Sequence, residues 1–307
     1  MSKEKVLIFG NGFVASLLAE SGQHRFDVTI SKANVLDNDA LRAAFDEHQP
    51  EIVVNTAAKT NIDWCEIHRD VTFKVNVLGS DNIAKLCSER GNYLVQFSSG
   101  CLQQSLGPND VKREGDPITP LCFYAWTKAW SEHLITDRCE RDGLRALFIR
   151  PRLLMSSRLS NRNSILKLLT YSRFVDVEQS ATIADDMVSA VWELVAQRAV
   201  GPYNVANPGL ISPWEIARML KETIDPTFSP IKIPVDDLNA FTRVRRIRTV
   251  LSTDRLQERH IELPEIKPSV RSVLRALKPQ LGTARGRRVL ARTQRDTKAK
   301  LRELPAP

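Results

Sequence analysis

The chain has 307 residues, of which 42% are hydrophobic and 26% are charged, as in a soluble globular protein of one large domain or two closely joined ones. Its net charge of +8 does not indicate a nucleic-acid-binding fold, because residues 281–307 carry eight Lys or Arg against two acidic residues and so hold six of the eight charges. No apolar run is long enough to cross a membrane, so composition and charge argue against both nucleic acid and a membrane as partners.

Cysteine usage and the first residues indicate the compartment. The chain has five cysteines, an odd number without a C-x-x-C pair, which argues against a disulfide framework and for a reducing environment. The N-terminus leads directly into an apolar strand rather than into the apolar core of a signal peptide, so we expect a cytoplasmic protein. The five histidines have no spacing typical of metal ligands, and we expect no metal.

Short apolar runs alternate with helical patterns through the first half of the chain. This alternation is typical of an α/β protein and predicts a Rossmann-type, doubly wound parallel sheet with both faces covered. Ligands then bind beyond the carboxyl ends of the strands. The predicted strands are 6–9, 26–30, 51–55, 93–97 and 146–149, and the predicted helices are 13–21, one that begins at Asp37, 70–90 and 124–142.

After Arg150-Pro151 the pattern loosens into short elements and turns, which predicts a smaller C-terminal substrate lobe. We assign residues 1–155 to a dinucleotide-binding domain, to which residues 182–206 return as a helix and a strand. Residues 156–181 and 207–278 then form the lobe. The basic C-terminal extension, 279–307, is interpreted as solvated and in part helical, with a weak electrostatic contact to RNA, a membrane or an acidic partner as the alternative.

A glycine-rich turn lies where the first predicted strand meets the first helix. In Gly10-Asn11-Gly12-Phe13-Val14-Ala15 the glycines permit a tight turn, and the helix N-terminus can receive a pyrophosphate. No acidic residue ends the second strand, where Ser31 and Lys32 stand instead. Because a lysine can pair with the additional phosphate of NADP, we favour NADPH, with NADH as the alternative if Lys32 only faces solvent.

A tyrosine and a lysine four residues apart lie on one face of a predicted helix, in Tyr124-Ala125-Trp126-Thr127-Lys128. Ser99 ends the strand before that helix, so its hydroxyl and the phenol could meet at one carbonyl oxygen. A free phenol has a pKa of about 10, and a neighbouring ammonium would ease proton transfer near neutrality. The combination predicts carbonyl reduction, although the Tyr-Lys spacing alone also occurs in surface pairs.

These residues resemble the extended short-chain dehydrogenase/reductase superfamily, in particular its dTDP-4-dehydrorhamnose reductase-like branch. The motifs that carry this resemblance are Val53-Val54-Asn55-Thr56-Ala57-Ala58, Phe73-Lys74-Val75-Asn76, Tyr124 with Lys128 and Glu132, Arg150, and Gly201-Pro202-Tyr203-Asn204. The pattern is most similar to the bifunctional 3,5-epimerase/4-reductases that make UDP-L-rhamnose in plants, over about residues 5 to 275. That similarity lies in Asn61-Ile62-Asp63-Trp64-Cys65-Glu66, Ser99-Gly100-Cys101, Leu159-Ser160-Asn161-Arg162-Asn163, Asn207-Pro208-Gly209 and Ile224-Asp225-Pro226.

The resemblance implies an NADPH-dependent oxidoreductase that reduces a 4-keto-6-deoxyhexose linked to UDP or dTDP. With 3,5-epimerisation the product is an NDP-6-deoxy-L-hexose such as NDP-L-rhamnose. It implies that Ser99, Tyr124 and Lys128 act in reduction and that Cys101 and Lys167 act in epimerisation. The related GDP-fucose synthase pattern has a histidine where this chain has Lys167.

The resemblance also implies the binding residues and allows a homodimer. Cofactor contacts are expected from the glycine-rich turn, Lys128, Asn55, Ala57 and Ala58, and substrate contacts from Asn61, Arg162, Asn163 and Arg246. Guanidinium groups suit the diphosphate of a sugar nucleotide. Two departures are a phosphate loop one residue shorter than the family's and a partial match at residues 245–249.

The order of the two reactions follows from the chemistry of the ketone. A carbonyl at carbon 4 acidifies the hydrogens on carbons 3 and 5, so epimerisation must precede reduction. Two alternatives stay open. One is a pure 4-reductase, in which Cys101 is a core thiol and Lys167 a solvated lysine. The other is a non-catalytic regulatory subunit similar to the β subunit of methionine adenosyltransferase, because fold does not settle function.

Overall fold

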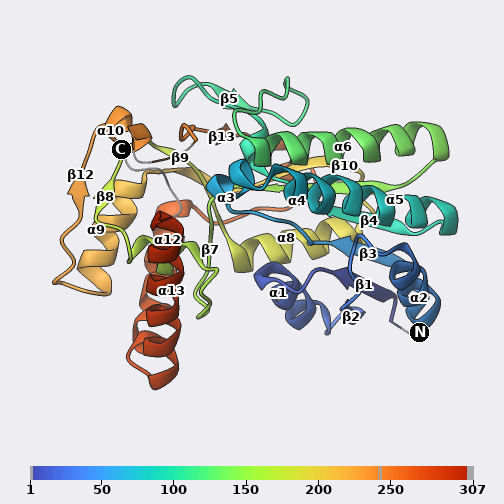
Figure 1. Cartoon of the computed structure of the whole chain (residues 1–307), viewed down its shortest axis with the longest axis horizontal. Helices are drawn as coiled ribbons and strands as arrows, with labels where there is room; N and C mark the ends of the chain where they lie inside the picture. Colours follow the sequence, from blue (N-terminus) through green and yellow to red (C-terminus); the bar gives the residue numbers. More distant parts are fainter. Residues whose placement is uncertain (1–2, 241, 243, 303–307) are drawn as a thin grey trace.

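The computed structural model describes residues 3–240, 242 and 244–302. A six-stranded parallel sheet lies at its centre, in the order β10-β6-β4-β3-β1-β2 (Figure 1). Its strands are β1 (Lys5–Phe9), β2 (Asp27–Ser31), β3 (Ile52–Asn55), β4 (Tyr93–Phe97), β6 (Ala146–Pro151) and β10 (Gly201–Val205). The predicted Rossmann-type sheet is therefore confirmed, with the five strands of the first half within two residues of their predicted ends.

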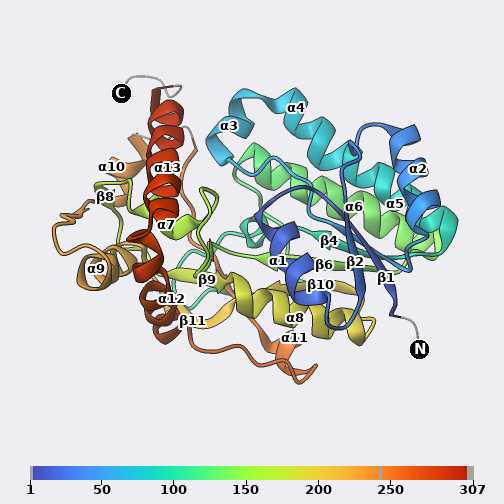
Figure 2. The ribbon, with the colours of Figure 1, turned by 90° about the horizontal axis from the view of Figure 1, so that it is seen from below.

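Helices cover both faces of this sheet. In Figures 1 and 2, α1 (Phe13–Gly22) and α8 (Ala184–Ala196) lie on one side, and α5 (Gly79–Arg90) and α6 (Phe123–Asp142) on the other. The pleat explains the division, because Val6 and Ile8 of β1 pack with α1 and α8, whereas Leu7 and Phe9 pack with α5 and with α2 (Asn38–His48). Such burial on both faces is why the inner strands are largely apolar runs, whereas the edge strand β2 contains polar residues.

The helix predicted over 70–90 is interrupted. It consists of α4 (Arg69–Phe73), a π-helical turn η1 (Lys74–Leu78) and α5, and it is preceded by a short helix, α3 (Ile62–Ile67), that was not predicted. Asn76 lies in the π-helical turn, and its side chain bonds the backbone N–H and C=O of Lys59 and the hydroxyl of Thr127. This turn therefore fixes the loop after β3 to α6.

A second layer contains the short strands β7 (Leu154–Met155), β9 (Gln179–Ile183) and β11 (Asn207–Ile211), which form a three-stranded sheet. The helices α7 (Ser164–Leu168), α9 (Pro213–Thr223) and α12 (Ile266–Leu281) share an apolar core with it. The smaller elements are η2 (Gly100–Leu102), β5 (Val111–Lys112), β8 (Arg173–Phe174), β12 (Ile231–Lys232), α10 (Val235–Ala240), β13 (Val250–Leu251) and α11 (Asp254–Gln257). The lobe boundaries given above stay a proposal.

The basic extension is a helix, α13 (Ala284–Arg302), that packs on the lobe rather than standing in solvent. Val289 joins the apolar core of the lobe, and Thr293 and Thr297 are buried. The Thr170 hydroxyl bonds that of Thr297 at 3.2 Å, and α13 runs beside α7 in Figure 2. The solvated interpretation was wrong for this face, because residues spaced by four bury one stripe while the arginines occupy the other faces.

None of the helices in the described ranges is long and apolar enough to span a membrane. Within 3–240, 242 and 244–302, no group of three or more His, Cys, Asp or Glu side chains could hold a metal ion.

Candidate active site

The carboxyl end of β4 and the first turn of α6 bring three predicted side chains together. Ser99 follows β4, and its hydroxyl accepts a hydrogen bond from the Cys101 N–H at 3.1 Å, which caps the short η2 helix. Tyr124 lies in the first turn of α6, and it packs with Cys101 in one buried cluster. A strand end and a helix start therefore place hydroxyl, thiol and phenol at one edge of the sheet.

The phenol of Tyr124 is only 8% exposed, and burial raises its pKa well above the usual range. Cys101 raises that pKa further, while a hydrogen bond with Ser99 lowers it. The phenol is therefore protonated near neutrality and is a proton donor in this state. The sequence had indicated that a neighbouring ammonium would tune the phenol, but burial, Cys101 and Ser99 are the largest influences on it.

Lys128 lies one turn further along α6, and it is 3% exposed. Its ammonium donates a hydrogen bond to the Phe97 carbonyl at 2.7 Å, at the end of β4. Burial lowers the pKa of Lys128 to about 8, and the charge of Glu132 opposes that shift. The lysine is therefore a buried cation that loses its proton close to neutrality.

Glu132 forms a buried ion pair with Arg150 of β6. Two hydrogen bonds join the groups, at 3.0 Å from Nε to Oε1 and at 2.5 Å from Nη2 to Oε2. Arg150 also donates from Nη1 to the Glu114 carbonyl at 3.1 Å. The pair connects α6 to the sheet directly beneath the site, and it holds a negative charge near Lys128.

Arg152 was not singled out from the sequence. Its Nη1 lies 2.7 Å from the sulfur of Cys101, and its Nη2 donates to the Gln179 side chain and to the Ile247 carbonyl. A guanidinium beside a thiol compensates negative charge on the sulfur. The available signal was a charged residue just beyond the carboxyl end of a parallel strand, where ligands bind in this fold.

Lys167 lies in α7, in the second layer, and it is half-buried. Its backbone carbonyl accepts a hydrogen bond from the Thr170 hydroxyl at 2.6 Å. The joint action of Lys167 and Cys101 stays a prediction.

The glycine-rich turn has the geometry that a close backbone approach requires. Gly10 has φ of +107°, and a Cβ there would lie 2.5 Å from the Thr56 hydroxyl and 2.8 Å from the Ala57 nitrogen. Any other residue would push apart the turn after β1 and the loop after β3. Gly12 is the N-cap of α1, whose first turn contains Phe13, Val14 and the buried Ala15.

Several residues that were expected to contact the cofactor use their side chains for hydrogen bonds within the protein. Asn55 is buried, donates to Ser80 and Gln96, and accepts from the Ala57 N–H. At the end of β2, the buried Ser31 accepts from the Ala33 N–H, whereas Lys32 is exposed. Ala57 and the half-buried Ala58 line the loop after β3. Lys32 is thus the side chain of this group that is open to a ligand phosphate.

Three of the four expected substrate residues are engaged elsewhere. Asn163 is fully buried and caps α7, accepting from the Ile165 N–H and donating to the Ser156 and Arg158 carbonyls. Asn61 caps α3 by accepting from the Trp64 N–H. Arg246 is ion-paired with Asp63 of α3 at 2.5 Å.

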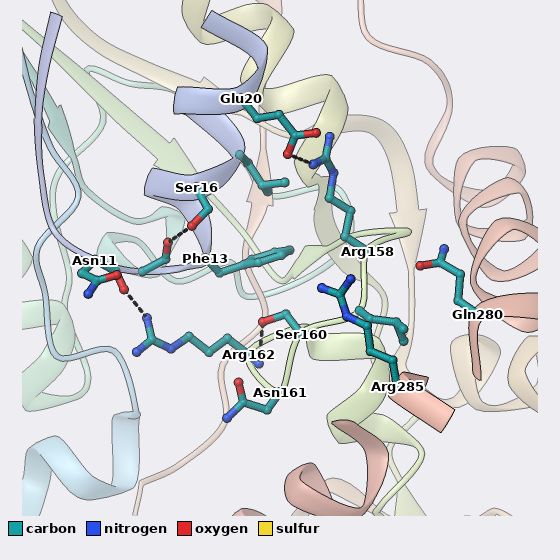
Figure 3. Close-up of a pocket in the computed structure, with 13 residues that line it drawn as sticks. Asn11, Phe13, Ser16, Glu20, Arg158, Ser160, Asn161, Arg162, Gln280 and Arg285 are labelled. Atoms are coloured by element: carbon teal, nitrogen blue, oxygen red, sulfur yellow. Dashed lines mark hydrogen bonds and ion pairs between the residues drawn. The ribbon is translucent and has the colours of Figure 1, made fainter. Parts of the chain in front are cut away.

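Arg162 lies at the dinucleotide turn. Its Nη1 donates to the Asn11 carbonyl at 3.4 Å, and it lines a cavity of about 710 Å³ beside α1 (Figure 3). The structure therefore places this guanidinium against the loop after β1, whereas Arg246 contacts α3. The contact of Arg162, Asn163 and Arg246 with the diphosphate of a sugar nucleotide stays a prediction.

Comparisons with known proteins agree with this geometry. The family model described as the RmlD substrate binding domain matches residues 4–278. The bifunctional dTDP-4-dehydrorhamnose 3,5-epimerase/dTDP-4-dehydrorhamnose reductase of Arabidopsis thaliana is 30% identical over 276 residues, which cover 86% of this chain and 90% of that protein.

Two solved structures have the same fold. The L780 UDP-rhamnose synthase from Acanthamoeba polyphaga mimivirus has a TM-score of 0.80 at 24% identity and covers 90% of this chain and 100% of its own. The dTDP-4-dehydrorhamnose reductase from Bacillus anthracis, in complex with NADP, has a TM-score of 0.78 at 20% identity and covers 91% of this chain and 99% of its own.

Proposed function

The chain belongs to the RmlD substrate binding domain family, and on that premise we propose that it is an NADPH-dependent reductase of a nucleotide-linked 4-keto-6-deoxyhexose. We propose 3,5-epimerisation in the same pocket, with an NDP-6-deoxy-L-hexose such as NDP-L-rhamnose as the product. The observation that carries the proposal is the buried Tyr124 phenol, which lies with Cys101 and Ser99 at the sheet edge that also bears the Gly10 turn. The names of the Arabidopsis and mimivirus proteins support the substrate class.

The residues present fit a dinucleotide. The close approach at Gly10 leaves no room for a side chain between the two turns, and the N–H groups at the start of α1 are available to a pyrophosphate. Lys32, exposed at the end of β2, supports NADPH over NADH. When bound, the reduced nicotinamide supplies a hydride to the carbonyl carbon of the substrate.

In the reduction, the chain's task is to polarise the carbonyl and to supply a proton. The Ser99 hydroxyl and the Tyr124 phenol donate hydrogen bonds to the oxygen on carbon 4. As negative charge develops on that oxygen, Tyr124 transfers its proton to it and leaves an alcohol. The Lys128 ammonium then stabilises the phenolate until a proton from solvent replaces the one lost.

In the epimerisation, a base removes the proton from carbon 3 or 5 and the electron pair moves to the carbonyl oxygen, where Ser99 and Tyr124 stabilise it. Return of a proton to the opposite face inverts the centre. We assign these proton transfers to Cys101 and Lys167. The guanidinium of Arg152 lies where it compensates negative charge on the sulfur.

Product analysis tests the dual activity. With NADPH and UDP- or dTDP-4-keto-6-deoxyglucose, we expect mass spectrometry and NMR to identify an L-configured 6-deoxyhexose without a separate epimerase. Cys101→Ala and Lys167→Met should lose the inversion and still bind cofactor. Cys139→Ala, which removes a half-buried thiol at the far end of α6, is the matched control.

The outcomes separate the remaining alternatives. A D-configured product from the unaltered chain would leave a pure 4-reductase. No NADPH consumption with any keto-sugar nucleotide of a panel that varies the base would favour the non-catalytic regulatory subunit. The retention of Ser99, Tyr124 and Lys128 in one site argues against that class, because a binding module has no need of a buried proton donor. The homodimer stays a prediction.

The pH dependence of the reaction should report Lys128. Because burial lowers the pKa of Lys128 to about 8, we expect kcat/KM to fall as pH rises through that value and the ammonium loses its charge. Lys128→Arg keeps a permanent positive charge and should remove this descending limb while lowering the maximal rate. Rates of NADPH oxidation measured across the pH range provide the check. A profile that stays flat far above pH 8 would contradict it.

A further inference from the structure

A cavity outside the Ser99–Tyr124 site lies between the first turns of α1, the loop 158–162 and the start of α13. It measures about 710 Å³, and Gly12, Phe13 and Ser16 form one wall. Arg158, Arg162 and Arg285 also line the cavity. In Figure 3 the Arg158 guanidinium points to Glu20 and that of Arg162 to the Asn11 carbonyl, whereas that of Arg285 points into the open space. Three guanidinium groups from two segments, the loop 158–162 and α13, therefore line one cavity.

The charge in this cavity is only partly compensated. Arg158 is ion-paired with Glu20, and its Nε lies 3.6 Å from Asp185. Among the described residues, Arg162 and Arg285 have no carboxylate partner. Two uncompensated cations and the N–H groups at the start of α1 attract an anion, and guanidinium groups suit phosphate oxygens in particular.

Arg285 is held beside the cavity because α13 is anchored at several points. Asp296 accepts a hydrogen bond from Asn161 at 3.0 Å, one residue from Arg162. Gln280, just before α13, donates to the Ser157 carbonyl at 2.8 Å. α13 thus contacts one end of the loop that carries Arg158 and Arg162, and the last turn of α12 contacts the other. α13 begins beyond residue 278, where the family match ends.

We propose that α13 completes a diphosphate-binding site, in which Arg285 and Arg162 bind the two phosphates between them. The inference rests on the proposed function in one respect, since both the dinucleotide and the sugar nucleotide of that reaction contain a diphosphate. The basic extension is then part of the binding machinery of this chain, added to the family domain.

The test compares Arg285→Gln with Arg292→Gln. Arg292 is one heptad further along α13, exposed and outside the cavity, so its loss removes the same charge without the contact. Dissociation constants are measured for NADPH, for UDP and dTDP, and for inorganic pyrophosphate. We expect Arg285→Gln to weaken pyrophosphate and one of the nucleotide classes about tenfold, the value of one charge-assisted hydrogen bond. Arg292→Gln should have little effect, and Arg285→Lys an intermediate one.

Which nucleotide class weakens identifies the source of the diphosphate. If neither class nor pyrophosphate weakens, or if both variants weaken binding equally, the site is overturned. Because Arg285 is exposed, thermal unfolding of its variants should match that of the unaltered chain. Arg285-dependent binding of pyrophosphate without any binding of NADPH would support this site and remove the proposed reductase. NADPH binding with no effect of Arg285→Gln on NADPH, UDP, dTDP or pyrophosphate would overturn this site and leave the proposed reductase in place.

Discussion

Tyr124→Phe should lower kcat for reduction by about 10²- to 10⁴-fold, the contribution of a positioned general acid. Phenylalanine keeps the ring that packs among Cys65, Cys122 and Val244, so the fold and the cofactor site should change little. Only the hydroxyl group, and with it the proton donor, is lost. The reason to expect a loss near the upper end is that burial keeps the phenol protonated, which leaves Tyr124 as the donor at the carbonyl oxygen. NADPH oxidation at saturating keto-sugar nucleotide measures kcat, and fluorescence titration measures NADPH binding.

Tyr203→Phe is the matched control for this substitution. It also removes a buried phenol, but one on β10 whose oxygen accepts from the Arg259 guanidinium at 3.1 Å. We expect kcat to stay near that of the unaltered chain. Equal losses in the two variants would indicate a packing effect, and a Tyr124→Phe protein with full kcat would remove the phenol from the mechanism.

The sheet could be predicted because the sequence pattern that indicates each strand is local. The inner strands β1, β3, β4 and β6 are largely apolar runs of four to six residues between turns, and burial on both faces requires that pattern. The Ser99, Tyr124 and Lys128 side chains could also be predicted as a group, since one strand end and one helix turn position them. The contact between Arg152 and Cys101 joins residues 51 apart, and no local spacing encodes it.

Asn163 and α13 show two other limits of prediction from the sequence. Asparagine serves equally as a helix cap and as a ligand contact, and only the observed start of α7 assigns Asn163 to the cap. In α13 the buried stripe is Val289, Thr293 and Thr297, two of which are threonines. So weak an apolar pattern among arginines is indistinguishable in sequence from a solvated helix, and composition alone favoured that interpretation.

The ion pair beneath the site should have the largest effect on stability. Arg150→Met leaves the Glu132 carboxylate buried without its partner, and such an uncompensated charge costs about 3–5 kcal/mol. The exposed pair of Arg141 and Asp137 provides the control, because Arg141→Met should cost no more than about 1 kcal/mol. Urea unfolding of each variant, extrapolated to water, gives the free energies.

The double variant Arg150→Met with Glu132→Leu shows whether stability requires the ion pair itself, or only that neither charge is buried without its partner. Replacing both groups with apolar side chains removes the buried charge, so much of the stability should return.

Glu132 also opposes the effect of burial on the pKa of Lys128. As pH rises, activity should therefore begin to decline at a lower pH value in Glu132→Gln than in the unaltered chain, because the Lys128 ammonium loses its proton more readily. If Arg150→Met costs no more than Arg141→Met, or if the pH profile of Glu132→Gln does not move, the buried pair does not couple the sheet to the catalytic lysine.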